Sequence, residues 1–160
     1  MAASPLLVTL RRATRQGWAP GAASLRRWAS TALGARARGA ELSILLVGPQ
    51  RSRSLNRRYR GCDAATNILS FPAAAAPVPR SRHAAPARLL GDLVICPQVL
   101  QREARAQGKS ARAHWMHLVI HGALHLIGYD HQRAAEAVRM ERRETRLLRS
   151  LGVADPYRSP

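Results

Sequence analysis

Three histidines carry the clearest chemical signal in the sequence. His121 and His125 are four residues apart, so on a helix both imidazoles lie on one face, one turn apart. Gly128 lets the chain leave the helix, and His131 can then return as a third ligand. Three neutral nitrogen ligands with one open position are typical of catalytic zinc, which lowers the pKa of a bound water to about 7. The spacing therefore predicts a zinc site formed by His121, His125 and His131.

Two further histidines precede this group. His117 lies on the same helical stripe, but the distance from His117 to His125 along a helix is roughly 12 Å at 1.5 Å per residue. One ion cannot reach both ends of that stripe. We therefore expect His114 and His117 to pack, to orient a ligand or to face a polyanionic partner rather than to bind the metal.

Two acidic residues lie near the histidines in the sequence. Asp130 can orient an imidazole or cap the last helix, and the sequence favours neither role over the other. Glu144 shares a helical stripe with Met140 and Leu147. For Glu144 we expect an ion pair with a neighbouring arginine, with the orientation of a metal ligand as the alternative.

The residue after the first histidine argues against peptide hydrolysis. Metzincin proteases share the spacing of zinc ligands, but they carry a glutamate directly after the first histidine as the general base. Gly122 occupies that position here, and glycine has no side chain to accept a proton. A metalloprotease therefore stays only a minor alternative.

The net charge points to a polyanionic partner. The 160 residues include 26 Lys and Arg against 9 Asp and Glu, a formal net charge of +17. Nucleic acid is the first candidate and an anionic membrane surface the second. No apolar run approaches the roughly 20 residues of a membrane-spanning helix. Cys62 and Cys96 form neither a disulfide scaffold nor a paired zinc motif, which fits a reducing cytoplasm.

Hydrophobic periodicity, proline and glycine divide the chain into short elements. Pro49 and Pro97 are typical first residues of helices, and Gly61 and Gly128 are typical helix ends. The segment 72–88 is rich in Ala, Pro and Arg and is expected to be a long surface loop. We expect strands at 6–10, 41–47, 67–71 and 89–96, the last broken by Gly91, and helices at 24–33, 49–59, 97–107, 110–126 and 132–151.

These elements predict a single α+β domain over residues 1–160. We expect a small mixed four-stranded sheet packed with about five helices, with the metal site on a helix and the turn after it. The basic, Ala-rich segment 1–40 also has the composition of an organelle transit peptide, but a strand and a helix in it favour a mature N-terminal unit. The tail over 153–160 is expected to be loose.

Several segments in order resemble one known family. They are LNRRYRG at 55–61 followed by Asp63, TNILSFP at 66–72, GDLVIC at 91–96, HGALHLIGYDH at 121–131, and Leu151–Gly152 with Asp155–Pro156–Tyr157. Together they resemble the YbeY endoribonucleases, bacterial factors of rRNA maturation, over roughly residues 41–157. The chain departs from the family at Cys62, where Lys is usual, at Ala65, where Pro is usual, and in a longer loop over 72–88.

The resemblance implies both an activity and partners. It implies zinc at the three histidines, a functional arginine at Arg60, and single-strand RNA cleavage in maturation of the 3′ end of small-subunit (16S) rRNA and in ribosome quality control. It also implies a small-subunit ribosomal protein as a partner, with Asp92 at the contact, and a location in the bacterial cytoplasm.

Phosphodiester cleavage develops negative charge on the phosphoryl oxygens, which cations on two sides of the phosphate stabilise. Zinc can supply one side and Arg60 the other, while Arg57 and Arg58 follow the RNA backbone by charge alone. A metal-bound water and the RNA 2′-hydroxyl both stay open as the nucleophile. The alternative from another class is a non-catalytic ribosome-assembly factor with a structural zinc.

Overall fold

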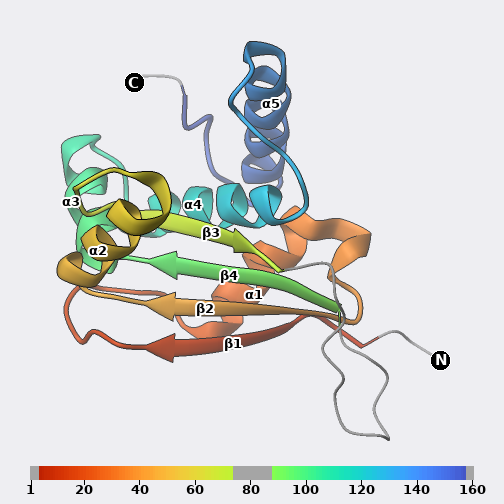
Figure 1. The fold of residues 1–160 in the computed structure, drawn as a ribbon. Helices are drawn as coiled ribbons and strands as arrows, with labels where there is room; N and C mark the ends of the chain where they lie inside the picture. The colour runs from red at the N-terminus through yellow and green to blue at the C-terminus, as the bar shows by residue number, and fades with distance from the viewer. Residues whose placement is uncertain (1–3, 74–87, 158–160) are drawn as a thin grey trace, which may run out of the picture.

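A four-stranded sheet lies at the centre of the fold (Figure 1). The structure, a computed structural model, describes residues 4–73 and 88–157. Its strands follow the order β1-β2-β4-β3, with β1, β2 and β4 parallel and β3 antiparallel to β4. Their bounds are β1 (Leu7–Arg12), β2 (Ala40–Leu46), β3 (Ile68–Pro72) and β4 (Arg88–Ile95). The predicted mixed sheet is confirmed.

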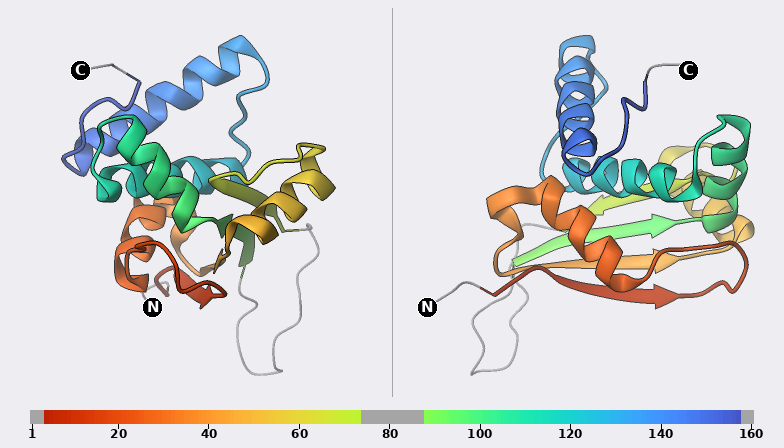
Figure 2. Two further views of the ribbon diagram at one scale, coloured as in Figure 1. Left: turned by 90° about the vertical axis from the view of Figure 1, so that its left-hand side faces the viewer. Right: turned by 180° about the vertical axis from the view of Figure 1, so that it is seen from behind.

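The helices lie on both faces of this sheet. Within the described residues they are α1 (Ala22–Leu33), the 3-10 helix η1 (Gly34–Ala37), α2 (Pro49–Arg60), α3 (Pro97–Ala106), α4 (Ala111–Leu126) and α5 (Ala134–Ser150). Helices α1 and α4 cover one face, and α5 packs on the outer side of α4 (Figure 2). Leu55 of α2 packs against Val47, Leu69 and Val94. This arrangement confirms the predicted α+β domain class.

The main core fills the space between the sheet and the helices α1 and α4. Trp28 of α1 and Trp115 of α4 are both fully buried there, together with Ile44 and Leu93 from the sheet. Strand side chains alternate between the two faces, so the residues next to these core positions point to the opposite side. Burial of one sheet face against α1 and α4 therefore fixes which residues of the sheet stay exposed.

Helix α4 is buried around most of its circumference. Ten of its 16 residues are buried, because the sheet, α1 and α5 contact it from different sides. Ser110 begins the helix, and its side-chain oxygen accepts a hydrogen bond from the backbone N–H of Ala113 at 3.1 Å. His117, His121 and His125 form a stripe that is only partly exposed. The surrounding core thus fixes the helix that carries the imidazoles.

Gly91 does not break β4 as the sequence suggested. The strand is continuous and contains a bulge, since Glu41 pairs with Leu89 and Leu42 with Gly91. Gly91 has a φ of 137°, and a Cβ there would lie 2.1 Å from the carbonyl oxygen of Phe71. The glycine therefore allows close strand pairing at the bulge instead of ending the strand.

Two other expectations concern the loop and the tail. Most of the loop expected at 72–88 lies outside the described residues. The tail was expected to be loose from residue 153, but residues 153–157 pack against the domain, and 158–160 lie outside the described part. None of the helices in the described segments combines the length and the hydrophobicity needed to cross a membrane.

Candidate metal centre

Three imidazoles converge at the C-terminal end of α4. The Nε2 atoms of His121 and His125 are 3.1 Å apart, and Nδ1 of His131 lies 3.0 Å from Nε2 of His125. Ring nitrogens of a tetrahedral zinc site lie roughly 3.3 Å apart, because each bond is about 2.0–2.1 Å long. The three side chains therefore form a possible metal site whose donor spacing fits a single ion.

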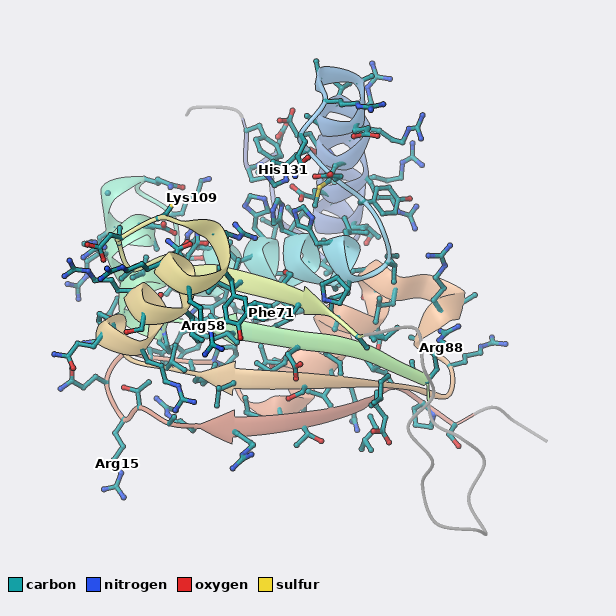
Figure 3. The ribbon with its side chains drawn as sticks, in the orientation of Figure 1. Arg15, Arg58, Phe71, Arg88, Lys109 and His131 are labelled. Carbon is teal, nitrogen blue, oxygen red and sulfur yellow. The ribbon has the colours of Figure 1, made fainter. Side chains whose placement is uncertain are left out.

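A helix-ending turn delivers the third imidazole. The N–H of Tyr129 bonds to the carbonyl of Leu124 at 3.1 Å, and the N–H of Gly128 bonds to the carbonyl of His125 at 3.1 Å. These two bonds form a Schellman motif, in which Gly128 adopts the positive φ of 99°. The chain then reverses, and His131 returns towards α4 from the segment that leads to α5 (Figure 3).

Asp130 supports this turn through the backbone. Its Oδ1 atom accepts hydrogen bonds from the N–H groups of His131 at 2.6 Å and Gln132 at 3.3 Å. In the described residues it makes no hydrogen bond to an imidazole, and α5 begins only at Ala134. Asp130 thus holds the loop that carries His131 and does not cap α5, while an orienting effect on an imidazole stays a prediction.

Gly122 brings α4 close to the sheet. A Cβ at this position would lie 2.7 Å from Cδ1 of Ile68 and 2.9 Å from Cδ2 of Leu93. A side chain at residue 122 would therefore point into the sheet and away from the three imidazoles. The geometry adds a second reason against a protease, since a glutamate here would face Ile68 and Leu93 instead of the histidines.

Glu144 lies behind the imidazoles as a fully buried carboxylate. It bonds to Nδ1 of His121, to Nε2 of His117 at 3.1 Å and to the hydroxyl of Tyr157. Burial raises the pKa of Glu144, but hydrogen bonds from His117, His121 and Tyr157 outweigh it and lower this pKa to about 2. The expected ion pair with an arginine is wrong, because the described partners of Glu144 are two histidines and a tyrosine.

His125 is held in its neutral form. Burial lowers its pKa to about 4, helped by the charges of His121, His131 and Arg60 and opposed by Asp130. An uncharged imidazole is the form that binds a metal ion. His125 therefore has no imidazolium proton to lose when a cation binds at neutral pH.

A cleft of about 440 Å³ opens in front of the imidazoles. Arg60, from the last turn of α2, lines it together with the three histidines. The Arg60 guanidinium forms no hydrogen bond or ion pair within the two described segments. The structure thus places Arg60 beside the three imidazoles, and the roles that the resemblance implies for these four residues stay predictions.

A hydrogen-bond network of Asn67, Glu103 and His114 also lines the cleft. Nδ2 of Asn67 donates to the Glu103 carboxylate at 3.1 and 3.2 Å, and Nε2 of His114 bonds to Oε2 of Glu103 at 2.7 Å. Burial raises the pKa of Glu103, but the bonds from His114 and Asn67 lower it overall. His114 is almost wholly buried. It therefore has a role in shaping the cleft, and the spacing of the sequence did not single out its partner Glu103.

Arg57, Arg58 and Asp92 lie away from the cleft. Arg57 and Arg58 are exposed on α2, and the Arg58 guanidinium stacks 5.3 Å from the Tyr59 ring (Figure 3). Asp92 is exposed on β4 next to Leu93, so it faces the side of the sheet opposite to α4. None of the three lines the cleft with the imidazoles.

The sequence predicted an orienting role for Glu144 and His117 only as an alternative, and it predicted none for Tyr157. Glu144 had a signal, since an acid on the buried stripe of an arginine-rich helix needs polar partners in the interior. Tyr157 had no spacing that linked it to the histidines. His117, considered as an orienting residue, does contact Glu144 and reaches the hydroxyl of Tyr157 at 3.3 Å.

The fold and the cleft define a small α+β protein with a candidate three-histidine metal centre. Residues 19–152 match the family model described as endoribonuclease YbeY. The protein named endoribonuclease YbeY from Stutzerimonas stutzeri is 55% identical over 141 residues, which cover 88% of this chain and 85% of that protein. Its namesake from Halorhodospira halophila is 49% identical over 139 residues, 87% of this chain and 88% of that protein. The chain belongs to the YbeY family.

A solved structure supports the fold independently. The solution structure of a Thermotoga maritima protein aligns with a TM-score of 0.57 at 22% identity, covering 96% of this chain and 99% of that one. At this level of identity the likeness supports the architecture alone. It agrees with the arrangement of sheet and helices in Figure 1.

Proposed function

We propose that the protein is a zinc-dependent endoribonuclease that cleaves single-stranded RNA, acting in the maturation of the 3′ end of 16S rRNA and in ribosome quality control in the bacterial cytoplasm. The observation that carries the proposal is the cleft, where three imidazoles and the guanidinium-bearing Arg60 line one space. Membership of the YbeY family and the net charge of +17 support RNA as the substrate.

In this proposal the histidines bind the metal and Arg60 binds the phosphate. His121, His125 and His131 hold the zinc, which supplies Lewis acidity and lowers the pKa of a bound water when present. Arg60 binds the phosphate from the other side with two parallel N–H donors. Its guanidinium is always charged, so it stabilises the developing negative charge at any physiological pH.

The surface next to the cleft offers a path for the RNA strand. A larger cavity of about 820 Å³ shares Lys109 and His117 with the cleft, and Arg112 and Arg149 also line it. Arg57 and Arg58 add charge on the exposed face of α2. These groups bind phosphates without reading the base sequence, so we expect affinity to fall steeply as salt rises.

Asp92 is proposed to contact a small-subunit ribosomal protein, away from the reaction site. It is exposed on the sheet face opposite to α4, where a small-subunit ribosomal protein can bind without covering the cleft. Such a contact would bring the enzyme to its substrate while the metal centre stays accessible.

The test is cleavage of a labelled single-stranded RNA that spans the 3′ end of small-subunit rRNA. Wild type, Arg60→Ala and His121→Ala are purified identically, with Arg15→Ala as a matched loss of one exposed charge far from the cleft (Figure 3). We expect Arg60→Ala and His121→Ala to lose about tenfold or more in rate and Arg15→Ala to stay within about twofold.

Each contrary result has a definite meaning. Equal cleavage by all four proteins indicates a contaminating ribonuclease and favours the assembly factor with a structural zinc. Equal losses in Arg15→Ala and Arg60→Ala indicate that total charge matters and that the cleft does not place Arg60 at the reacting phosphate.

A further inference from the structure

The C-terminal tail, residues 153–157, reaches into the network behind the metal centre. Tyr157 is 45% exposed, yet its hydroxyl donates to the fully buried carboxylate of Glu144. The Tyr157 ring also meets the ring of His117 edge-on, with 5.5 Å between the centroids. A half-exposed side chain of the tail thus completes the hydrogen bonding of a buried charge.

Specific contacts fix the tail in this position. Nζ of Lys109, just before α4, donates to the carbonyl of Pro156 at 2.9 Å. The carboxylate of Asp155 accepts from the N–H of Tyr157 at 2.9 Å and from the hydroxyl of Thr145 in α5 at 3.5 Å. The tail is therefore tied to the start of α4 and to α5, the two helices that carry the network.

The Glu144 carboxylate divides its two oxygens between the tail and the metal centre. Oε1 bonds to Nδ1 of His121, while Oε2 bonds to Nε2 of His117 and to the hydroxyl of Tyr157. A carboxylate can only accept, so Nδ1 of His121 carries the proton. The lone pair of His121 is then on Nε2, the atom that faces His125.

This bond fixes both the tautomer and the ring angle of His121. A carboxylate behind a histidine ligand orients the imidazole and makes it a better donor. The orientation of Glu144 is set by bonds to both of its oxygens, and Tyr157 supplies one of the two bonds to Oε2. Loss of the tyrosine hydroxyl leaves His117 as the remaining described partner of Oε2.

We infer that the C-terminal tail is part of the metal centre, in which Tyr157 holds Glu144 and Glu144 orients His121, so that tail docking sets how tightly the metal is bound. This inference rests on the proposed metal site at His121, His125 and His131. Glu144 and Tyr157 act as positioning residues and touch neither the metal nor the substrate. Tyr157 also lies beyond the residues 19–152 that match the family model.

A competing arrangement uses the same atoms. His117, His121 and Glu144 also place three donor atoms close enough together for a cation. The Tyr157 hydroxyl already donates to Glu144 there, and His117 lies 3.3 Å from that hydroxyl. The atoms of His117, His121 and Glu144 that face one another are therefore already hydrogen-bonded, and the inference expects one ion per chain.

The experiment measures cobalt(II) binding to the full chain by visible absorption, with zinc competition for affinity. Tyr157→Phe removes a single hydroxyl group, and Tyr59→Phe is the matched control, because Tyr59 is an exposed tyrosine on α2. Glu144→Gln keeps the shape of the side chain and removes its charge. Thermal unfolding of each metal-free variant reports whether the fold is intact.

We expect one cobalt ion per chain in the wild type. Glu144→Gln should weaken binding about 10- to 100-fold, Tyr157→Phe about three- to tenfold with a changed absorption spectrum, and Tyr59→Phe less than about twofold. The changed spectrum matters, because a purely structural role of the tail would lower the unfolding temperature without altering the ligand field.

The contrary outcomes are separable. Tight binding by wild type with the same affinity and spectrum in Tyr157→Phe overturns the inference and leaves the proposed function intact. Two ions per chain overturn it as well, because the second cluster is then a metal site. No binding by the wild type overturns the zinc of the proposed function and this inference with it.

Discussion

Helices α4 and α2 both contribute side chains to the cleft, but they hold them in different ways. The imidazoles of α4 lie on a helix that is buried on most sides, and His121 is bonded to a buried carboxylate. On α2 only Ser52 and Asn56 are buried, and Arg60 projects from the last turn without a hydrogen-bond or ion-pair partner among the described residues. The imidazoles of α4 are thus held by packing and hydrogen bonds, whereas the described residues hold the Arg60 side chain through its helix alone.

The difference follows from what each group must bind. A metal ion needs its ligands within tenths of an ångström, and a network that fixes each ring supplies that precision. A phosphate on a flexible RNA strand tolerates a mobile cation. The backbone of α2 is nevertheless well placed, because Ser52 bonds to Thr66 and Asn56 to Ala64 in the loop after the helix.

The largest expected loss of metal and activity comes from changing His125, the second of the three proposed ligands along the chain. His125→Ala removes the imidazole that lies within 3.1 Å of both other ligands, so we expect loss of stoichiometric zinc and about a hundredfold or greater loss of RNA cleavage. Metal analysis after dialysis checks this. Arg60→Ala should keep its full metal content. If Arg60→Ala also loses zinc, the two helices are not independent and the comparison fails.

Acid should destabilise the α4 side more than the α2 side. In the metal-free protein the pKa of Glu144 is lowered from 4.5 to about 2, so its contribution is complete above pH 4.5 and is lost as the pH falls towards 2. The loss amounts to about 3 kcal/mol at 1.36 kcal/mol per unit. Because the pKa of His125 is also lowered, the free energy of unfolding falls further as the pH drops from 6.5 to about 4.

Urea unfolding of metal-free variants between pH 7 and pH 2.5 separates these contributions. Glu144→Gln should lose the steep decline below pH 4.5 that the wild type shows. Asp63→Asn removes a carboxylate that pairs with Arg53 on α2 at 2.8 Å. The hydrogen bond from Arg53 lowers the pKa of Asp63, but the pair is exposed, so this change should alter the pH profile much less than Glu144→Gln. A wild-type curve that stays flat below pH 4.5 contradicts the assignment of the buried charge.

The smallest effect concerns packing. Gly122→Ala places a methyl group 2.7 Å from Ile68, which lowers the free energy of unfolding by about 2 kcal/mol. The higher helix propensity of alanine raises it by about 1 kcal/mol. We expect a net loss of about 1 kcal/mol, a fall of about 3 °C in Tm by calorimetry. Gly48→Ala at the start of α2 meets only Thr14 at 3.9 Å and should change Tm less. Equal shifts would mean that α4 is no more tightly packed than α2.

Local spacing explains what the sequence could predict. The i, i+4 pair and the glycine after it are within one helix and one turn, so the approach of the three imidazoles follows from backbone geometry. That they bind zinc stays a prediction. The order of strands and helices was also predictable from periodicity, and most boundaries differ by only a few residues.

Long-range contacts explain what the sequence could not predict. The bond of Tyr157 to Glu144 depends on how the tail folds back over α5, and no periodic pattern encodes that path. The bulge at Gly91 depends on the carbonyl of Phe71 in a neighbouring strand. In both cases a residue's role is decided by a partner that only the tertiary structure brings near.

All the groups of the metal centre come from one continuous stretch, from Lys109 to Tyr157. Arg60 reaches the cleft only because β3 and β4 hold α2 and its loop across the sheet. Local opening of a protein occurs in contiguous cooperative units. We therefore expect the two halves of the cleft to open separately, so that a partial opening that releases α2 would leave a bound ion in place. On heating, activity should then be lost before the metal is.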